Sequence, residues 1–340
     1  MAKSSEDRLL SWLRGRLARS EGTPVTPGAP LLGDDAAHLP PGSFAVTVDS
    51  QIEGVHVPPG LPAPLLARRL LAVNLSDLAA TGAQPAYAFL ALSAVPGFDH
   101  RAFFNAFLDA CRRFGVRLAG GDLARHPQTT IATLTLLGTR PRGGRFLSRG
   151  NARPGDALWL SGTVGESAAG RFVIAGGASF DGRSVHLPPG FDSHGLGAAA
   201  RRAVRRHLLP APHLEVGRWL GRQRRAAAID LSDGLALDLS RLARESGVGA
   251  EVNAKALPFA ARFEALCRAI DRDPEALALG GGEDYVLLFA LPADREPPAR
   301  FGCTRIGTVI QPLRLRLLDR RRDGRSVPLP VLGWDHLAAK

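Results

Sequence analysis

The chain contains few cysteines, and their spacing excludes two kinds of small structural site. Cys111, Cys267 and Cys303 are odd in number, lie far apart and form no CxxC pair. A disulfide framework and a cysteine-ligated zinc site both need paired or regularly spaced cysteines. We therefore expect three reduced thiols, which is typical of a protein in a reducing compartment.

Long apolar runs are also absent. The longest stretch without a charged residue lies between Asp77 and Asp99, and it contains Pro85 and Pro96. Such a stretch is typical of a helix end, a turn and a strand, not of a membrane span. The first twenty residues show no apolar segment or cleavage site of a signal peptide. We expect a cytoplasmic protein with no membrane partner.

Lysine is rare, although the formal net charge is +11. Lys3, Lys255 and Lys340 are the only lysines among 43 basic residues, so the positive charge comes almost entirely from arginine. A basic chain can bind nucleic acid, and this remains an alternative hypothesis. However, no nucleic-acid recognition motif accompanies the charge, so we expect no nucleic-acid partner.

The common phosphate-binding motifs are missing as well. The chain has no GxxxxGK[ST] sequence, no kinase glycine-rich loop and no HRD sequence. GLGAAA at 195–200 does not follow an expected strand, which argues against a dinucleotide site. GTVGESAAG at 162–170 lies between an expected strand and an expected helix. Its glycines could cradle a phosphate through backbone amides or could allow tight packing, and both readings stay open.

The 340 residues, 45% of them hydrophobic, suffice for two domains with a core each. Strands alternating with helices predict an α+β architecture of two layered domains. We expect a helix over 5–19, a strand over 44–48 that ends at Asp49, and a strand over 116–119 that ends before Gly120. A Gly-, Pro- and Arg-rich segment at 140–156 indicates the boundary. The predicted domains are 1–145 and 146–340.

One apolar segment, LLAVNLSDLAATGA at 70–83, carries a carboxylate where a buried helix is expected. At 100° per residue, Asn74, Asp77 and Thr81 fall within a stripe about 60° wide, and nearly all other positions are Leu, Val or Ala. A helix that is apolar all round is buried. Because a buried carboxylate must be neutralised, paired or bound to a metal, Asp77 is a candidate cation ligand.

Several other aspartates share this context, four of them at or just after the expected end of an apolar strand, where open sheets place ligands. Oxygen ligands without His or Cys clusters suit Mg²⁺, which is usually held by a few carboxylates together with substrate phosphates. Carboxylates grouped in one cleft therefore predict phosphoryl transfer with several Mg²⁺ ions. For any single aspartate, a turn or cap role is the alternative. The candidates are Asp35, Asp49, Asp77, Asp122, Asp230 and Asp233.

Ten motifs in order along nearly the whole chain resemble the thiamine-monophosphate kinase family. They are GDDAA (33–37), VDSQIEGVH (48–56), AVNLSDLAATGAQP (72–85), GGD (120–122), RGNARPGD (149–156), SGTVGESAAG (161–170), IDLSDGL (229–235), LPF (257–259), GGEDY (281–285) and GW (333–334). The resemblance implies the two-domain fold of the aminoimidazole ribonucleotide synthetase-like superfamily. It also implies direct in-line transfer of the γ-phosphoryl group of ATP to thiamine monophosphate, and a homodimer whose N-terminal sheets pack together.

The resemblance also implies roles for individual residues. The implied Mg²⁺ ligands are Asp35, Thr47, Val48, Asp49, Asp77, Asp122, Asp230 and Asp233, with Asp35, Asp77, Asp122 and Asp230 central to catalysis. The implied ATP contacts are Gly121, Asp122, Arg149 and Ser232. The implied thiamine monophosphate contacts are His56, Glu283 and Trp334. Val48 stands where the family usually has Thr, so a metal contact there would use backbone oxygen.

Simpler readings of three of these residues stay open. His56 could be an ordinary loop histidine, Trp334 a core residue and Arg149 a surface charge. A sibling synthetase of the same superfamily is the alternative activity. Selenophosphate synthetases need a reactive residue in the N-terminal segment, where this chain has no cysteine, and the hydrogenase maturation enzyme needs a C-terminal cysteine. Aminoimidazole ribonucleotide synthesis is not excluded by any missing motif.

Overall fold

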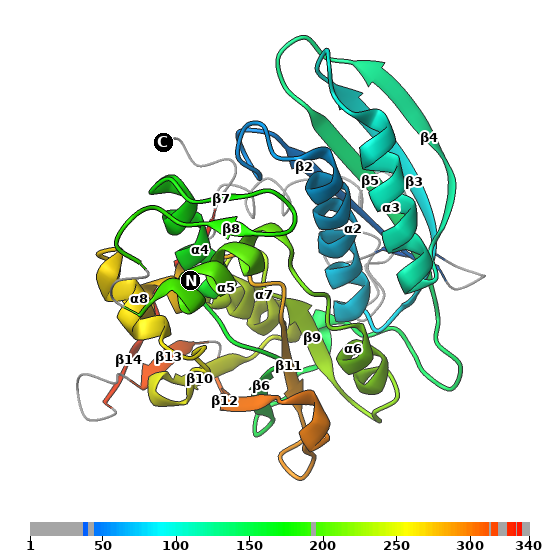
Figure 1. Cartoon of the computed structure of the whole chain (residues 1–340). Helices are drawn as coiled ribbons and strands as arrows, with labels where there is room; N and C mark the ends of the chain where they lie inside the picture. Colours follow the sequence, from blue (N-terminus) through cyan, green and yellow to red (C-terminus); the bar gives the residue numbers. More distant parts are fainter. Residues whose placement is uncertain are drawn as a thin grey trace.

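The computed structural model describes residues 37–39, 44–191, 195–312, 314–318, 325–330 and 332–334. It contains two large sheets, one formed by the N-terminal part of the chain and one by the C-terminal part (Figure 1). The helix expected over 5–19 and the segment with Asp35 lie outside the described residues. Within the described residues, no helix is both long enough and apolar enough to cross a membrane.

The N-terminal sheet has five strands and is covered by two helices on one face (Figure 1). Its strands are β1 (Ala37–Leu39), β2 (Phe44–Ile52), β3 (Gln84–Ala94), β4 (Arg117–Arg125) and β5 (Ile131–Thr139), in the order β1-β2-β5-β3-β4. The helices are α2 (Ala63–Ala80) and α3 (His100–Phe114). Alternate residues of β5 are buried, as expected for a sheet with one covered face.

Helix α2 confirms the expectation of a buried helix. Fifteen of its 18 residues are buried, and Asp77 is one of the few that are not fully enclosed. Pro62 occupies the N-cap position, where a missing N–H costs nothing. Helix α3 is instead amphipathic. It starts after Asp99, whose side chain accepts a hydrogen bond from the Ala102 amide, and it ends at Gly115 in a left-handed conformation.

Two of the expected strand ends are wrong. Strand β2 does not stop at Asp49 but runs to Ile52, and β4 runs directly through Gly120, Gly121 and Asp122. Both strands continue because a neighbouring strand pairs with them: Asp49 lies opposite Leu134, and Asp122 lies opposite Ala91. The sequence pattern could not reveal this, since polar residues are tolerated in a strand whose outer face is open.

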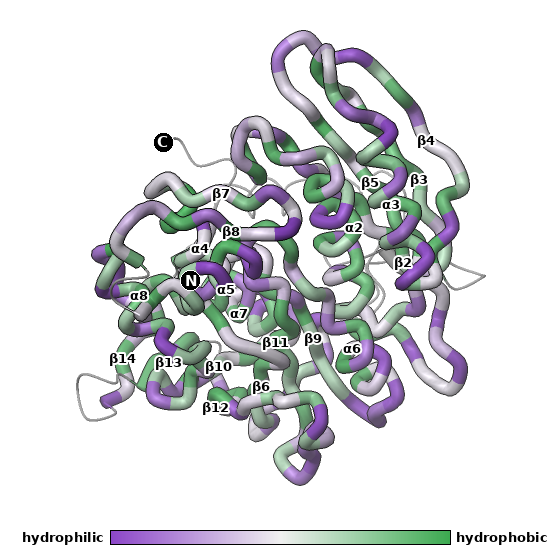
Figure 2. Tube along the Cα trace, in the orientation of Figure 1, coloured by the Kyte–Doolittle hydropathy of each residue, from purple (hydrophilic) through white to green (hydrophobic). Residues whose placement is uncertain are grey.

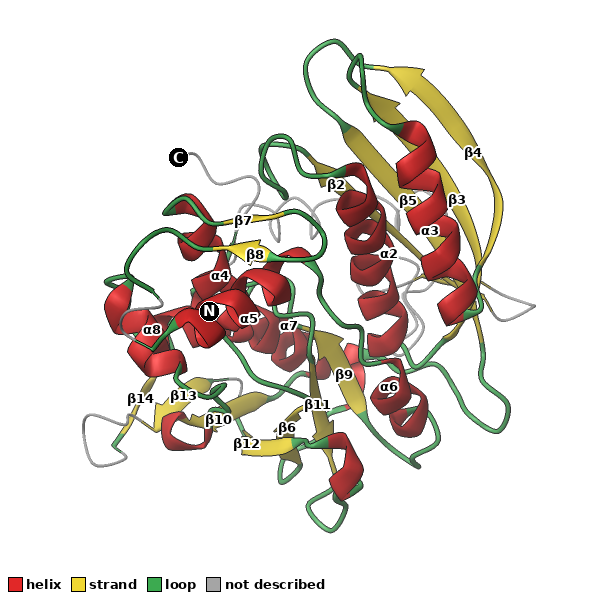
Figure 3. Ribbon diagram, viewed as in Figure 1, coloured by secondary structure: helices red, strands yellow, loops and turns green. Residues whose placement is uncertain are grey.

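The C-terminal sheet has seven strands and carries most of its helices on one side (Figure 3). Its strands are β6 (Ala157–Leu160), β9 (Ala227–Asp230), β10 (Gly249–Asn253), β11 (Leu287–Leu291), β12 (Thr304–Ile310), β13 (Leu315–Leu318) and β14 (Ser326–Pro328), in the order β14-β13-β10-β12-β6-β11-β9. The helices are α4 (Glu166–Ala175), α5 (Gly197–Leu208), α6 (Leu214–Leu220), α7 (Leu235–Ser246), α8 (Phe263–Ala269) and α9 (Pro274–Gly280). A small hairpin joins β7 (Ser179–Phe180) and β8 (Val185–His186), and the 3₁₀ turns are η1 (Arg149–Asn151), η2 (Ala254–Ala256) and η3 (Ala299–Phe301).

A continuous apolar core joins the two sheets. It contains Leu75 and Leu78 of α2 together with Phe289 of β11 and Leu220 of α6. Hydrophobic residues follow the interior strands, whereas hydrophilic residues gather on the outer loops (Figure 2). Helix α6 lies so close to α2 that a Cβ on Gly217 would be 2.0 Å from the carbonyl oxygen of Ala79. The two halves are therefore packed tightly along α2, the helix that carries Asp77.

Helices α4 and α5 make a similarly close contact, which gives a stability prediction. A Cβ on Gly170 would lie 2.1 Å from the carbonyl oxygen of Ala203, so Gly170→Ala must push the helices apart. We expect a loss of about 2–3 kcal/mol in the free energy of unfolding, measured by urea denaturation. Gly176→Ala is the matched control, because the nearest atom there is at 3.4 Å and φ is −78°. Equal stability of the two variants would contradict the prediction.

Candidate active site

Acidic residues from the two halves of the chain meet where α2 and β2 face the C-terminal end of β9. The Ser76 hydroxyl of α2 donates a hydrogen bond to Asp230 Oδ2 at 2.7 Å. The Thr47 hydroxyl of β2 donates a hydrogen bond to Asp77. Asp49, also on β2, lies close enough to Asp233 for the two charges to interact. Four of the sequence-predicted carboxylates thus lie along one boundary, and we call Asp49, Asp77, Asp230 and Asp233 the carboxylate cluster.

The turn from β9 to α7 places the two C-terminal members of this cluster. Asp230 is the last residue of β9, and Gly234 adopts φ +119°, which only glycine takes readily. The buried Asp238 carboxylate accepts hydrogen bonds from the Asp233 and Gly234 amides at 3.0 and 3.1 Å. Arg241 then pairs with both Asp233 and Asp238. Sequence reasoning missed these two residues, although an acidic residue in the first turn of a helix was a detectable signal.

Two carboxylates at this boundary, Asp49 and Asp238, have raised pKa values because they are buried. Burial, together with the charge of Asp233, raises the pKa of Asp49 to about 7, although Arg69 lowers it. Burial and the same Asp233 charge raise the pKa of Asp238 to about 7. A buried carboxylate is stabilised either by a bound proton or by a cation that pairs with its charge. The site is therefore suited to a divalent cation.

The donor set fits Mg²⁺ held jointly by protein and substrate. All candidate ligands are oxygen atoms, which Mg²⁺ prefers. Within the described ranges, no three His, Cys, Asp or Glu side chains are grouped closely enough to hold an ion by themselves. Mg²⁺ at phosphate-binding sites commonly takes one or two protein carboxylates, with the remaining ligands being water and phosphate oxygen. The arrangement of the described carboxylates fits that pattern.

Glu283 lies beside the cluster and is held in an ion-pair network. Its backbone, at φ +58°, donates a hydrogen bond to the Ser232 carbonyl oxygen at 2.6 Å. Its carboxylate pairs with Arg69 of α2 and lies 3.1 Å from His207 Nδ1. Burial alone would raise the pKa of Glu283, but Arg69 and His207 lower it to about 2. Glu283 is therefore a fixed negative charge at neutral pH.

The other two predicted substrate contacts lie next to these groups. His56 is close enough to Glu283 for its charge to help lower the pKa of the Glu283 carboxyl group, and its Nδ1 accepts a hydrogen bond from the Ile52 amide at 3.1 Å. The Trp334 amide donates a hydrogen bond to the Asp233 carbonyl oxygen at 2.9 Å. The Trp334 side chain is 39% exposed, so the alternative reading as a core residue is wrong.

The predicted ATP contacts lie in two places. Ser232 lies in the β9–α7 turn, and the charge of Arg149 in η1 reaches Asp238 at the start of α7. Gly121 lies on β4 instead, where a Cβ would be 1.9 Å from the Leu90 carbonyl oxygen. That close approach explains this glycine by packing alone. An ATP contact at Gly121 stays a prediction.

Asp122 and Val48 do not join the carboxylate cluster within one chain. Asp122 is exposed and pairs with exposed Ala91, on the face of the sheet away from α2. Its strand lies three strands from β2, about 14 Å at the usual strand spacing. The Val48 side chain, 59% exposed, also points away from the cluster, so only its backbone could reach a metal. Asp35 lies outside the described residues.

A further buried carboxylate, Asp284, fixes the start of α4 and gives a pH prediction. It accepts hydrogen bonds from the Gly165 and Ser167 amides at 2.7 and 3.2 Å. Burial raises its pKa to about 6. Between pH 4 and 6 the folded state therefore binds this proton more tightly than the unfolded state, and stability falls as pH rises. The quantity to follow is the free energy of unfolding of the native protein minus that of Asp284→Asn. We expect this difference to fall by at most about 3 kcal/mol between pH 4 and 6. Urea denaturation at several pH values tests this, and a pH-independent difference would contradict it.

The fold and the boundary site define a class of protein. Residues 33–139 match the family model described as AIR synthase related protein, N-terminal domain. The fold is similar to that of hydrogenase maturation protein HypE, at a TM-score of 0.62 and 21% identity over 88% of this chain and 94% of that chain. The protein therefore has the fold of the AIR synthase related proteins.

Closer similarities identify the family within this class. The chain is 37% identical to the thiamine-monophosphate kinase of Salmonella typhimurium over 90% of its length and 91% of the relative. It is 34% identical to the Escherichia coli enzyme over the same shares. A solved structure named "AaThiL complexed with AMPPCP and TMP" has a TM-score of 0.80 at 26% identity, covering 99% of both chains. The kinase from Stenotrophomonas maltophilia has a TM-score of 0.71 at 32% identity, covering 95% of this chain and 98% of that one. The chain belongs to the thiamine-monophosphate kinase family.

Proposed function

We propose that this protein transfers the γ-phosphoryl group of ATP to thiamine monophosphate, giving thiamine diphosphate and ADP. The observation that supports this most directly is the meeting of Asp49, Asp77, Asp230 and Asp233 at one boundary. Donor and acceptor are both phosphorylated, so their approach requires compensation of negative charge. A relative of the same fold binds an ATP analogue and TMP, by its description.

The chain's own residues would hold the reacting groups in line. When held by Asp49, Asp77, Asp230 and Asp233, Mg²⁺ would supply positive charge against the negative charge that develops during transfer. Asp77 and Asp230 are held in place by Thr47 and Ser76, so their oxygens are oriented before any ligand arrives. Arg149 and Ser232 would contact ATP beside the β9–α7 turn. Preorganisation of this kind lowers the cost of reorganisation in the transition state.

The acceptor would bind on the other side of the cluster. Glu283 is ionised and fixed by Arg69 and His207, so it can attract the positive charge of the thiamine ring system. The half-exposed indole of Trp334 can cover a cationic ring. His56 would complete this pocket from the N-terminal half. With these roles, domains 1–145 and 146–340 would each contribute residues to a site that lies between them.

A homodimer formed through the open face of the N-terminal sheet would explain why Asp122 lies away from the carboxylate cluster of its own chain. That face exposes Val48 and Phe89, at 59% and 43%, and an exposed apolar sheet face is typical of an interface. Asp122 lies on the same face. We infer that Asp122 acts in a site that includes the second subunit. Mixing inactive Asp122→Asn and Asp77→Asn subunits should then restore part of the activity. No recovery, with mixed dimers verified by tagged copies, would place Asp122 in its own subunit's site.

Product identification tests the proposed reaction. Purified protein incubated with ATP, Mg²⁺ and thiamine monophosphate should form thiamine diphosphate and ADP in equal amounts. Formation of ADP without thiamine diphosphate would reject the proposal. The alternative, aminoimidazole ribonucleotide synthesis, is tested in the same assay with the substrate of that reaction. Turnover of that substrate and not of thiamine monophosphate would favour the sibling activity.

A further inference from the structure

A basic pocket lies beside the proposed acceptor site but shares none of its predicted residues. It encloses about 370 Å³ between the loop before α4 and the last turns of α5. Arg202, Arg205 and Arg206 line it, against one acidic residue, Glu166. This volume is at the lower end of the range for small-molecule sites, about 300–1,000 Å³. We call it the arginine pocket.

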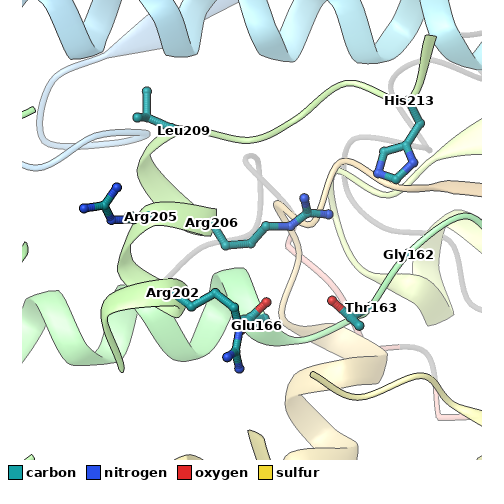
Figure 4. A pocket seen from close by; sticks show the side chains of 8 residues that line it. All are labelled: Gly162, Thr163, Glu166, Arg202, Arg205, Arg206, Leu209 and His213. Carbon is teal, nitrogen blue, oxygen red and sulfur yellow. The ribbon is translucent and has the colours of Figure 1, made fainter. Parts of the chain in front are cut away.

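Arg206 contributes a guanidinium group to the arginine pocket and has unused hydrogen-bond donors. Its Nη2 donates to the Asp284 carbonyl oxygen at 2.8 Å, while its Nε is buried without a partner. It forms no ion pair with a carboxylate of the described residues. Figure 4 shows its guanidinium group extending across the pocket towards His213. Since arginine stays protonated and Arg206 has no carboxylate counter-charge among the described residues, the Nη atoms of this group are suited to an anion.

The other walls supply complementary donors. Thr163 and His213 face the pocket from two sides of Arg206 (Figure 4). Burial, with the charge of Arg206, lowers the pKa of His213 to about 4, so its neutral ring can donate one N–H at pH 7. Arg202 is held by Glu166 and by the Ala261 carbonyl oxygen. The pocket therefore offers a guanidinium fork, a hydroxyl group and an imidazole around one space.

We propose that the arginine pocket binds the phosphate group of a small phosphorylated molecule, separately from the site of phosphoryl transfer. Guanidinium groups bind phosphate through two parallel hydrogen bonds, and the hydroxyl and imidazole donors suit its remaining oxygens. Residues of the arginine pocket also contact the segment that would bind thiamine monophosphate. Arg206 holds the backbone of Asp284, the neighbour of Glu283, and His207, which follows Arg206, contacts Glu283 directly. A ligand that binds Arg206 therefore acts on the segment carrying Glu283.

Calorimetry on the full chain without Mg²⁺ or nucleotide tests this site. The probes are inorganic phosphate, glycerol 3-phosphate and the dicarboxylate succinate. We expect both phosphates to bind and succinate to bind at least tenfold more weakly. Binding of the ester but not of free phosphate would still support the site and would assign it to organic phosphates. Equal binding of succinate, or no binding of either phosphate, would overturn the proposal.

Two variants with opposite expected effects locate the binding. Arg206→Gln should weaken phosphate binding about tenfold, because one charge-assisted contact is lost. Glu166→Gln should tighten it, because it removes the carboxylate that competes for Arg202. Arg201→Gln is the control, since Arg201 lies on the same helix but does not line the pocket. Folding of each variant is checked by thermal denaturation. Unchanged affinity in both Arg206→Gln and Glu166→Gln would overturn the proposal.

Asp77→Asn separates this inference from the proposed kinase activity. Asp77 does not line the arginine pocket, so the variant should bind phosphate as the native protein does even where it forms no thiamine diphosphate. Loss of phosphate binding in Asp77→Asn would show that the probe occupies the carboxylate cluster, and would overturn the assignment to the arginine pocket. Failure of the kinase assay alone leaves the binding result unaffected.

Discussion

Replacing Asp77 by Asn should lower the turnover number for thiamine diphosphate formation by about 10²–10³-fold while the protein stays folded. The Asp77 carboxylate lies at the boundary between the two sheets and is oriented by the Thr47 hydroxyl. Asn keeps the size and can still accept that hydrogen bond, but it removes the negative charge available to a cation. Steady-state kinetics at saturating ATP and Mg²⁺ measure the loss.

The Asp77→Asn substitution should not lower the stability of the fold. Carboxylates at this boundary repel one another, since the charge of Asp233 raises the pKa of Asp49, so the loss of one negative charge should not weaken the fold. The midpoint of thermal unfolding without Mg²⁺ should be equal to or above that of the native protein. Asp109→Asn is the matched control, because Asp109 lies on α3 with an exposed side chain that pairs with Arg112. A turnover number within about twofold of the native value for Asp77→Asn would remove Asp77 from the site.

The sequence predicted the buried helix well, because its signal is local and strong. A segment of Leu, Val and Ala interrupted by Asp77 has few alternatives to a buried helix, and α2 confirms it. The sequence also predicted the β9–α7 turn, since Asp230 ends a short apolar strand and Asp233 and Gly234 follow it. In both places local composition and tertiary environment favour the same structure.

The placement of Asp122 could not be predicted, because it depends on pairing between distant segments. GGD at 120–122 is typical of a turn after a strand, yet β4 continues through it by pairing in parallel with β3. The register then determines the face on which the carboxylate lies, and a shift by one residue would reverse it. Likewise, the Arg69–Glu283 pair joins residues 214 positions apart, which no local pattern reveals.

Breaking the Arg69–Glu283 ion pair should have the second large effect, a loss of stability. Arg69 is fully buried in α2, and its guanidinium donates to Gln51 Oε1 at 2.7 Å, to the His207 carbonyl oxygen and to the Glu283 carboxylate. Arg69→Met keeps most of the apolar volume but leaves Glu283 without its main counter-charge. Breaking a buried ion pair from one side costs about 3–5 kcal/mol. Because Glu283 is 25% exposed, we expect about 3 kcal/mol in the free energy of unfolding, measured by urea denaturation.

The neighbouring residue provides a close control for this variant. Arg68 lies on the same turn of α2 but is exposed, so Arg68→Met should change the free energy of unfolding by less than about 0.5 kcal/mol. Arg69→Met should also raise the KM for thiamine monophosphate, because a displaced Glu283 no longer attracts the cationic acceptor. A merely structural role would lower stability and leave that KM unchanged.

A double-mutant cycle then separates the ion pair from packing. Glu283→Gln removes the charge that Arg69 compensates, so adding it to Arg69→Met should recover part of the lost stability. We expect a coupling energy of about 1–3 kcal/mol between the two positions. Strictly additive losses would mean that Arg69 stabilises the boundary through Gln51 and the His207 carbonyl oxygen alone. In that case Glu283 would be oriented by His207, and the N-terminal half would contribute no charge to the acceptor side.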